Sequence, residues 1–182
     1  NKYMAYNKSD ILKVIQILHR EFKLPYQERL DFNTFQKFLE KNGGVVKEKE
    51  FSQTFLEDGY IQLNEDNTFL ICLNSERYGS DGRKYFNLVK FFGHLLFHTS
   101  YLEEKNKKEI FKNEVFHNRY YDTYESEAVE FAKSLLMPYE DMKEEMYENS
   151  KNGHIDMNKI AEIFKVDEQM ATIRAGNLGF IS

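Results

Sequence analysis

The sequence lacks tryptophan and has only one cysteine and two prolines among its 182 residues. A single cysteine, Cys72, excludes both an internal disulfide and a cysteine-based zinc cluster, and it fits a reducing compartment. No apolar run approaches the roughly 20 residues that a membrane span needs, and the first residues lack the apolar core of a signal peptide. We therefore expect a cytoplasmic protein without a membrane partner.

The charge balance also disfavours one class of function without excluding a local basic patch. The net charge of −5 argues against broad contact with phosphate groups, so we do not expect a nucleic acid partner. Hydrophobic residues make up 41% of the chain, and its 16 Phe and 12 Tyr predict an aromatic core. The low numbers of Pro and Gly argue against disorder, and the length suits one domain, or one domain with a small appendage.

Hydrophobic periodicity predicts an α+β fold with a small, mostly antiparallel sheet packed against helices. The predicted helices cover about 9–23 (capped by Ser9 or Asp10), 31–41, 84–100, 123–137, 156–164 and 168–177, and the predicted strands cover 60–63 and 68–74, joined by a turn at 64–67. Cys72 is predicted to be a buried packing residue of the second strand.

The C-terminal part is predicted to be helical. Residues 139–152 form an acidic amphipathic stretch whose Met142, Met146 and Tyr147 indicate a surface helix or a contact surface for a partner. The last two helices are predicted to form a pair similar to a helix-turn-helix. We assign residues 1–150 to the main domain and 151–182 to a C-terminal helical extension packed on it.

The most informative stretch is residues 84–98, KYFNLVKFFGHLLFH. Zinc peptidases carry His-Glu-x-x-His on such a helix, with two imidazoles on one face and a glutamate that activates water. In this register His94 occupies the second histidine position, whereas Lys90 replaces the first histidine and Phe91 replaces the glutamate.

Motifs along most of the chain carry a resemblance to a known family. They are the strand end Ile71-Cys72-Leu73-Asn74, the helix with Arg83, Phe86 and Gly93-His94-Leu95-Leu96-Phe97-His98, the stretch from Glu125 to Leu135-Leu136-Met137-Pro138, and the C-terminal Ala161, Phe164, Val166, Arg174 and Leu178-Gly179. With these motifs the chain resembles the ImmA/IrrE family of metallopeptidases. The resemblance implies a zincin-like metallopeptidase fold.

The resemblance also implies the roles of individual residues. His94 and Glu125 are the remnants of the zinc ligands, while Asn87 and Val129, the latter in place of an asparagine, are supporting or packing residues. No catalytic residue remains, because Phe91 cannot accept a proton from water. A buried Glu125 without a cation would be costly, so we expect an ion pair between Lys90 and Glu125 to replace the metal, and we expect no cofactor.

Three interpretations of function remain open. The first is an inactive peptidase that binds a repressor, antirepressor or toxin-type protein as a regulator in a mobile-element or stress-response module. The second is an active metallopeptidase that cleaves a repressor-type protein through a shifted zinc site of His94, His98 and Glu125, with Glu103, Glu104 or His117 as further candidate ligands. The third, DNA binding by the C-terminal helix pair, is disfavoured by the acidic charges there.

Overall fold

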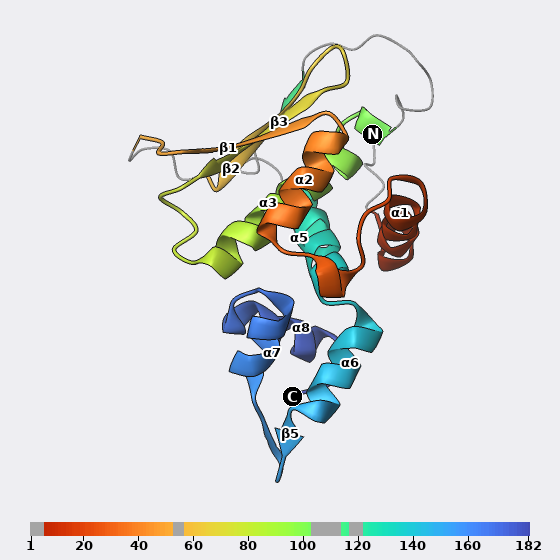
Figure 1. Cartoon of the computed structure of the whole chain (residues 1–182), viewed down its shortest axis with the longest axis vertical. Coiled ribbons are helices and arrows are strands. Elements are labelled where there is room, and N and C mark those ends of the chain that lie inside the picture. The colour runs from red at the N-terminus through yellow and green to blue at the C-terminus, as the bar shows by residue number, and fades with distance from the viewer. Residues whose placement is uncertain (1–5, 53–56, 103–113, 117–121) are drawn as a thin grey trace.

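The computed structural model describes residues 6–52, 57–102, 114–116 and 122–182. These residues form an α+β fold with a sheet at one end and helices packed beneath it (Figure 1). The helices are α1 (Lys8–Glu21), η1 (Gln27–Arg29), α2 (Phe32–Lys41), α3 (Asp81–His98), α5 (Asp122–Leu136), α6 (Tyr139–Glu148), α7 (Met157–Phe164) and α8 (Glu168–Asn177). The strands are β1 (Gly44–Lys49), β2 (Gly59–Leu63), β3 (Phe69–Asn74), β4 (Glu114–Phe116), β5 (Ser150–Lys151) and β6 (His154–Ile155).

The main sheet has the strand order β1-β3-β2-β4 within the described residues. β1 pairs in parallel with β3, whereas β2 pairs antiparallel with both β3 and β4, so the sheet is mostly antiparallel as predicted. The predicted turn between β2 and β3 is also present. Asn67 adopts a positive φ of 62° there, and its N–H donates to the carbonyl of Asn64 at 3.0 Å.

Helix α3 is the centre of the molecule, because every residue from Tyr85 to Phe97 is buried. Its Phe92 ring packs edge-on against Phe35 of α2 and Phe131 of α5, with centroids 5.7 and 6.2 Å apart. A Cβ on Gly93 would lie 2.8 Å from Phe131 Cδ1 and 3.4 Å from the Ala128 backbone. Glycine at this position therefore lets α3 and α5 approach closely, and the site forms between these two helices.

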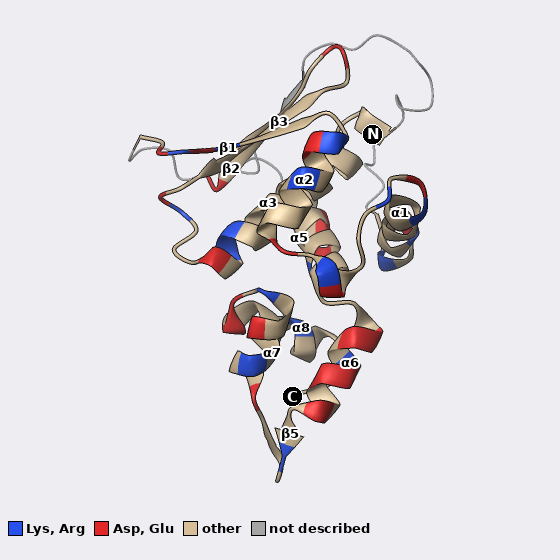
Figure 2. Ribbon diagram, viewed as in Figure 1, with Lys and Arg blue, Asp and Glu red and all other residues tan. Residues whose placement is uncertain are grey.

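The C-terminal helices lie at the end of the molecule away from the sheet, and α6 carries several acidic residues (Figures 1 and 2). α7 and α8 form the predicted pair, joined through Lys165 in the left-handed conformation with a φ of 58°. Arg174 of α8 donates from Nε to the carbonyl of Met137 at 3.0 Å and lies 3.6 Å from Glu130, which fastens α8 to α5. None of the described helices is long and apolar enough to cross a lipid bilayer.

The structure corrects three details of the sequence interpretation. The cap of α1 is Asn7, which bonds reciprocally with Asp10, because the helix begins before the predicted cap positions. The proposed Met/Tyr contact surface on α6 is wrong for its methionines, because Met142 and Met146 are buried in the core while only Tyr147 is highly exposed. A short β5–β6 hairpin, which the sequence did not predict, follows α6 at Glu148. Cys72 is buried, as predicted.

Candidate functional site

The candidate site lies between α3 and the first turns of α5. Helical spacing of four residues places Lys90, His94 and His98 on one face of α3 at successive turns. Lys90 is 2% exposed and His94 is fully buried. Glu125 of α5 faces them, and Asp58 approaches from the start of β2. We call Asp58, Lys90, His94, His98 and Glu125 the Lys90 cluster.

The Lys90 ammonium group bridges two carboxylates. Its Nζ lies 2.9 Å from Glu125 Oε1 and 2.6 Å from Asp58 Oδ2. Arg77 Nε lies 3.9 Å from the other oxygen of Asp58, so two cationic side chains accompany two acidic ones. A buried cation between two carboxylates is a closed electrostatic unit, in which each charge offsets the desolvation of its neighbour.

Asp58 is the partner that sequence reasoning missed. Its backbone is fixed by Asn74, whose N–H donates to the Asp58 carbonyl at 2.8 Å and whose side-chain amide donates to the Glu57 carbonyl at 2.9 Å. The next residue, Gly59, has a φ of +155°, and a Cβ there would lie 2.2 Å from the Cys72 carbonyl oxygen. The sequence signal for this position was the Asp-Gly dipeptide directly before a predicted strand, because Asp-Gly is typical of a tight turn at the start of a strand.

Two histidines extend the Lys90 cluster along α3. His94 Nε2 lies 2.8 Å from Glu125 Oε2, and His94 Nδ1 lies 2.9 Å from His98 Nδ1. Burial lowers the pKa of His94, although Glu125 opposes the shift, and burial together with His94 lowers the pKa of His98 to about 3. Both rings are therefore neutral at pH 7, and the assignment that satisfies both contacts has His94 Nε2–H donating to Glu125 and His98 Nδ1–H donating to His94 Nδ1.

Glu125 is held in its ionised form. Burial alone would raise its pKa, but hydrogen bonds from His94 and the charge of Lys90 lower it to about 2. Beyond this carboxylate, the His98 ring stacks on Tyr124 with centroids 4.3 Å apart and lies 3.8 Å from the carboxylate of Glu127. The carboxylates of Asp58 and Glu125, the Lys90 ammonium group and both ring nitrogens of His94 are thus each engaged by a neighbour.

Phe91, at the position of the water-activating glutamate, is fully buried. Its ring centroid lies 5.9 Å from the His94 ring and 5.1 Å from Lys90 Nζ, so it covers the site with apolar surface. Asn87 is 3% exposed and its Nδ2 finds no acceptor among the described residues. Val129 is partly buried and packs against the core.

A comparison with protein families identifies the scaffold. The family model Peptidase_M78, the IrrE N-terminal-like domain, matches residues 39–175. This chain belongs to the Peptidase_M78 family. No curated protein matches the chain. The matched segment runs from the end of α2 into α8, so it includes Lys90, His94 and Glu125 within the family scaffold.

The residues of this Peptidase_M78 chain do not fit the zinc site that the resemblance to the ImmA/IrrE metallopeptidases implies. A catalytic zinc needs three protein ligands, whereas only His94 and Glu125 remain, and they lie 2.8 Å apart in contact with each other. The other oxygen of Glu125 faces an ammonium group rather than a third ligand. Within the described part of the chain, no three His, Cys, Asp or Glu side chains form a group that could hold a metal ion.

The shifted zinc site meets a further geometric obstacle. His94 contacts Glu125 through one ring nitrogen and His98 through the other, so the two candidate ligands lie on opposite sides of the same imidazole. The further candidates Glu103, Glu104 and His117 lie outside the described residues.

Proposed function

We propose that this member of the Peptidase_M78 family has no peptidase activity and acts as a regulator by binding another protein. The observation that carries the proposal is the Lys90 ammonium group between Asp58 and Glu125, at 2.6 and 2.9 Å. A peptidase of this type needs three zinc ligands, an open position for water and a general base. Here a cation takes one ligand position and a phenyl ring takes the place of the base.

The partner class that we propose is a repressor, antirepressor or toxin-type protein in a mobile-element or stress-response module. This class follows from the family resemblance, in which active relatives cleave regulatory proteins of that kind. A scaffold that has lost hydrolysis but kept its shape would hold such a protein without cleaving it. We propose that this takes place in the cytoplasm and without a bound cofactor.

The decisive experiment measures metal content and binding in the same sample. Untagged protein is purified with zinc in the medium, and elemental analysis is expected to find far less than one zinc per chain. Co-purification with the products of neighbouring genes is expected to recover an intact partner at a fixed stoichiometry. One tightly bound zinc per chain would contradict the replacement of the metal by Lys90, and cleavage of that partner that a chelator stops and His94→Ala abolishes would establish the active metallopeptidase.

A further inference from the structure

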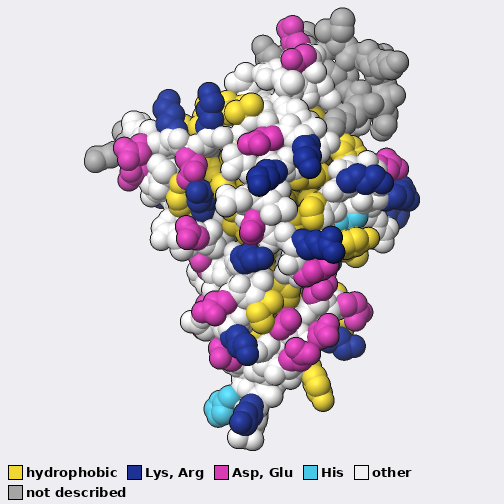
Figure 3. All heavy atoms as spheres, in the orientation of Figure 1, with side chains coloured by type: hydrophobic (Ala, Val, Ile, Leu, Met, Phe, Trp, Pro, Cys, Tyr) yellow, Lys and Arg dark blue, Asp and Glu magenta, His cyan; other side chains and the backbone are white. Residues whose placement is uncertain are grey.

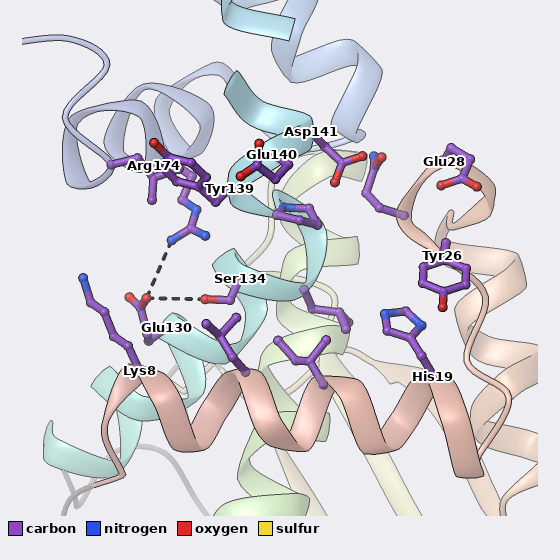
Figure 4. Close-up of a pocket in the computed structure, with 16 residues that line it drawn as sticks. Lys8, His19, Tyr26, Glu28, Glu130, Ser134, Tyr139, Glu140, Asp141 and Arg174 are labelled. Carbon is purple, nitrogen blue, oxygen red and sulfur yellow. Dashed lines mark hydrogen bonds and ion pairs between the residues drawn. The ribbon is translucent and has the colours of Figure 1, made fainter. Parts of the chain in front are cut away.

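A second hollow in the molecule has no role in the proposed function. It is a cavity of about 570 Å³ that is lined by α1, η1, α5, α6 and α8 and open to solvent, and it shares no lining residue with the Lys90 cluster (Figure 4). This volume is within the range of sites that hold small organic molecules. We call it the α1–α6 pocket.

The walls of the α1–α6 pocket are apolar and partly aromatic. Leu12, Tyr26 and Tyr139, which line it, are three of the seven large hydrophobic residues that are exposed within the described chain. The His19 ring stacks on Tyr26 with centroids 4.5 Å apart, and His19 Nδ1–H donates to the Leu24 carbonyl at 2.8 Å, which fixes the ring. Exposed apolar groups that gather around a hollow mark a binding site more strongly than the same groups scattered over a surface.

The charges around this pocket are unevenly balanced. Four acidic side chains line it, against Lys8 and Arg174. Figure 4 shows Lys8, Glu130 and Arg174 together at one end and Asp141 and Glu28 toward the other. Arg174 and Lys133 both lie within 3.6 Å of Glu130, whereas Glu28, Glu140 and Asp141 have no ion pair with any described residue.

The surface view agrees with this arrangement. Hydrophobic, acidic and basic side chains lie next to each other where the region of α1 meets α6 (Figure 3). An apolar wall beside unpaired acidic groups attracts a ligand that combines an apolar body with a positive charge, because each part finds its complement.

We propose that the α1–α6 pocket binds a small organic cation, whose aromatic or aliphatic body lies on Leu12, Tyr26 and Tyr139 and whose amine faces Glu28, Glu140 and Asp141. The site would add a ligand-binding function to the protein-binding role proposed above, and it does not depend on that role. The His19–Tyr26 stack and the ion pair between Arg174 and the partly buried Glu130 order two parts of the pocket wall in the absence of a ligand.

The absence of tryptophan allows a direct test with tryptamine as the probe. Excitation at the red edge of indole absorption reports on the ligand alone, so its fluorescence anisotropy measures binding to the whole chain. Saturable binding with a Kd on the order of 1 mM or tighter is expected. Indole-3-propionate has the same ring and spacer with a carboxylate in place of the amine. Its Kd is expected to be higher than that of tryptamine by a factor of about 5 or more.

Variants assign the binding to the pocket. The double substitution Glu28→Gln and Asp141→Asn is expected to remove the preference for tryptamine over indole-3-propionate. Glu144→Gln is the matched control, because Glu144 is an exposed acid on the same helix α6 that does not line the pocket. Equal binding of the two probes to the unmodified chain, no saturable binding of tryptamine, or a preference that survives the double substitution would each overturn the proposal.

Discussion

The Lys90 cluster and the α1–α6 pocket both gather acidic side chains, but they differ in what balances them. In the Lys90 cluster a buried lysine offsets Asp58 and Glu125 from within the protein, and the buried Phe91 ring lies beside Lys90 and His94. In the α1–α6 pocket Glu28, Glu140 and Asp141 face a cavity of about 570 Å³ without a cationic partner among the described residues. The acidic groups of the Lys90 cluster are balanced within the protein, whereas those of the α1–α6 pocket are available to a ligand. Substitutions in the Lys90 cluster should therefore lower the free energy of unfolding, and substitutions in the α1–α6 pocket should weaken ligand binding.

The largest effect is expected from Lys90→Met, which keeps most of the length of the side chain and removes its charge. Glu125 and Asp58 would then be left without their shared cation, and the free energy of unfolding should fall by about 3 kcal/mol. Denaturant titration measures the loss. Lys84→Met is the matched control on the same helix, because Lys84 pairs with Glu48 at 2.9 Å near the surface and should cost about 1 kcal/mol or less. Equal losses in the two variants would contradict a structural role for Lys90.

The next prediction asks whether the Lys90 cluster can be returned to a metal site. Lys90→His removes the ammonium group and supplies an imidazole four residues before His94, as in a zinc helix. At a zinc concentration 100 times Kd, the variant should gain about 2.7 kcal/mol of stability, which thermal melting with and without zinc can measure. The same variant with His94→Ala should show no gain. A zinc response as large in the unmodified chain would show that Lys90 does not block the site.

The close approach of α3 and α5 can be tested without touching a charge. Gly93→Ala would place a Cβ 2.8 Å from the Phe131 ring, so the helices must separate and stability should fall by about 1–3 kcal/mol. Gly176→Ala is the control in α8, because a Cβ there meets nothing within 4 Å and alanine favours helix by about 1 kcal/mol. If Gly93→Ala left the free energy of unfolding unchanged, the packing of the site would tolerate a wider separation of α3 and α5.

Whether a feature could be predicted from the sequence depends on how far apart in the chain its interacting residues lie. The helices and the turn at Asn64–Asn67 were predictable, because caps, periodicity and turn residues act over a few positions. The family motifs also placed Lys90, His94 and Glu125 at one site. Asp58 was not found, because its contact with Lys90 spans 32 positions and depends on how β2 enters the sheet. The α1–α6 pocket has no local signal either, since five separate elements form its walls.

Lowering the pH perturbs the Lys90 cluster less than a substitution of Lys90 does. The pKa of Glu125 is lowered from 4.5 to about 2 in the folded chain, so its ionised form stabilises the fold. This contribution is fully present above about pH 4.5 and is lost as the pH falls toward about 2. Glu125→Gln should therefore show a smaller loss of stability across this window than the unmodified chain when denaturant titrations are compared at several pH values. Parallel curves would mean that Glu125 is not held by Lys90 and His94.

The smallest effect on stability is expected in the α1–α6 pocket. Leu12 is 51% exposed, so Leu12→Ala removes little buried surface and keeps a strong helix former in α1. The free energy of unfolding should change by about 0.5 kcal/mol or less, while the affinity for tryptamine should fall because the ligand loses part of its apolar wall. Ile11→Ala in the same helix is the contrasting variant: Ile11 is only 1% exposed, does not line the pocket and should cost about 2 kcal/mol or more. If Leu12→Ala destabilised the chain as strongly as Ile11→Ala, Leu12 would act as a core residue, and the distinction between a closed cluster and an open pocket would fail.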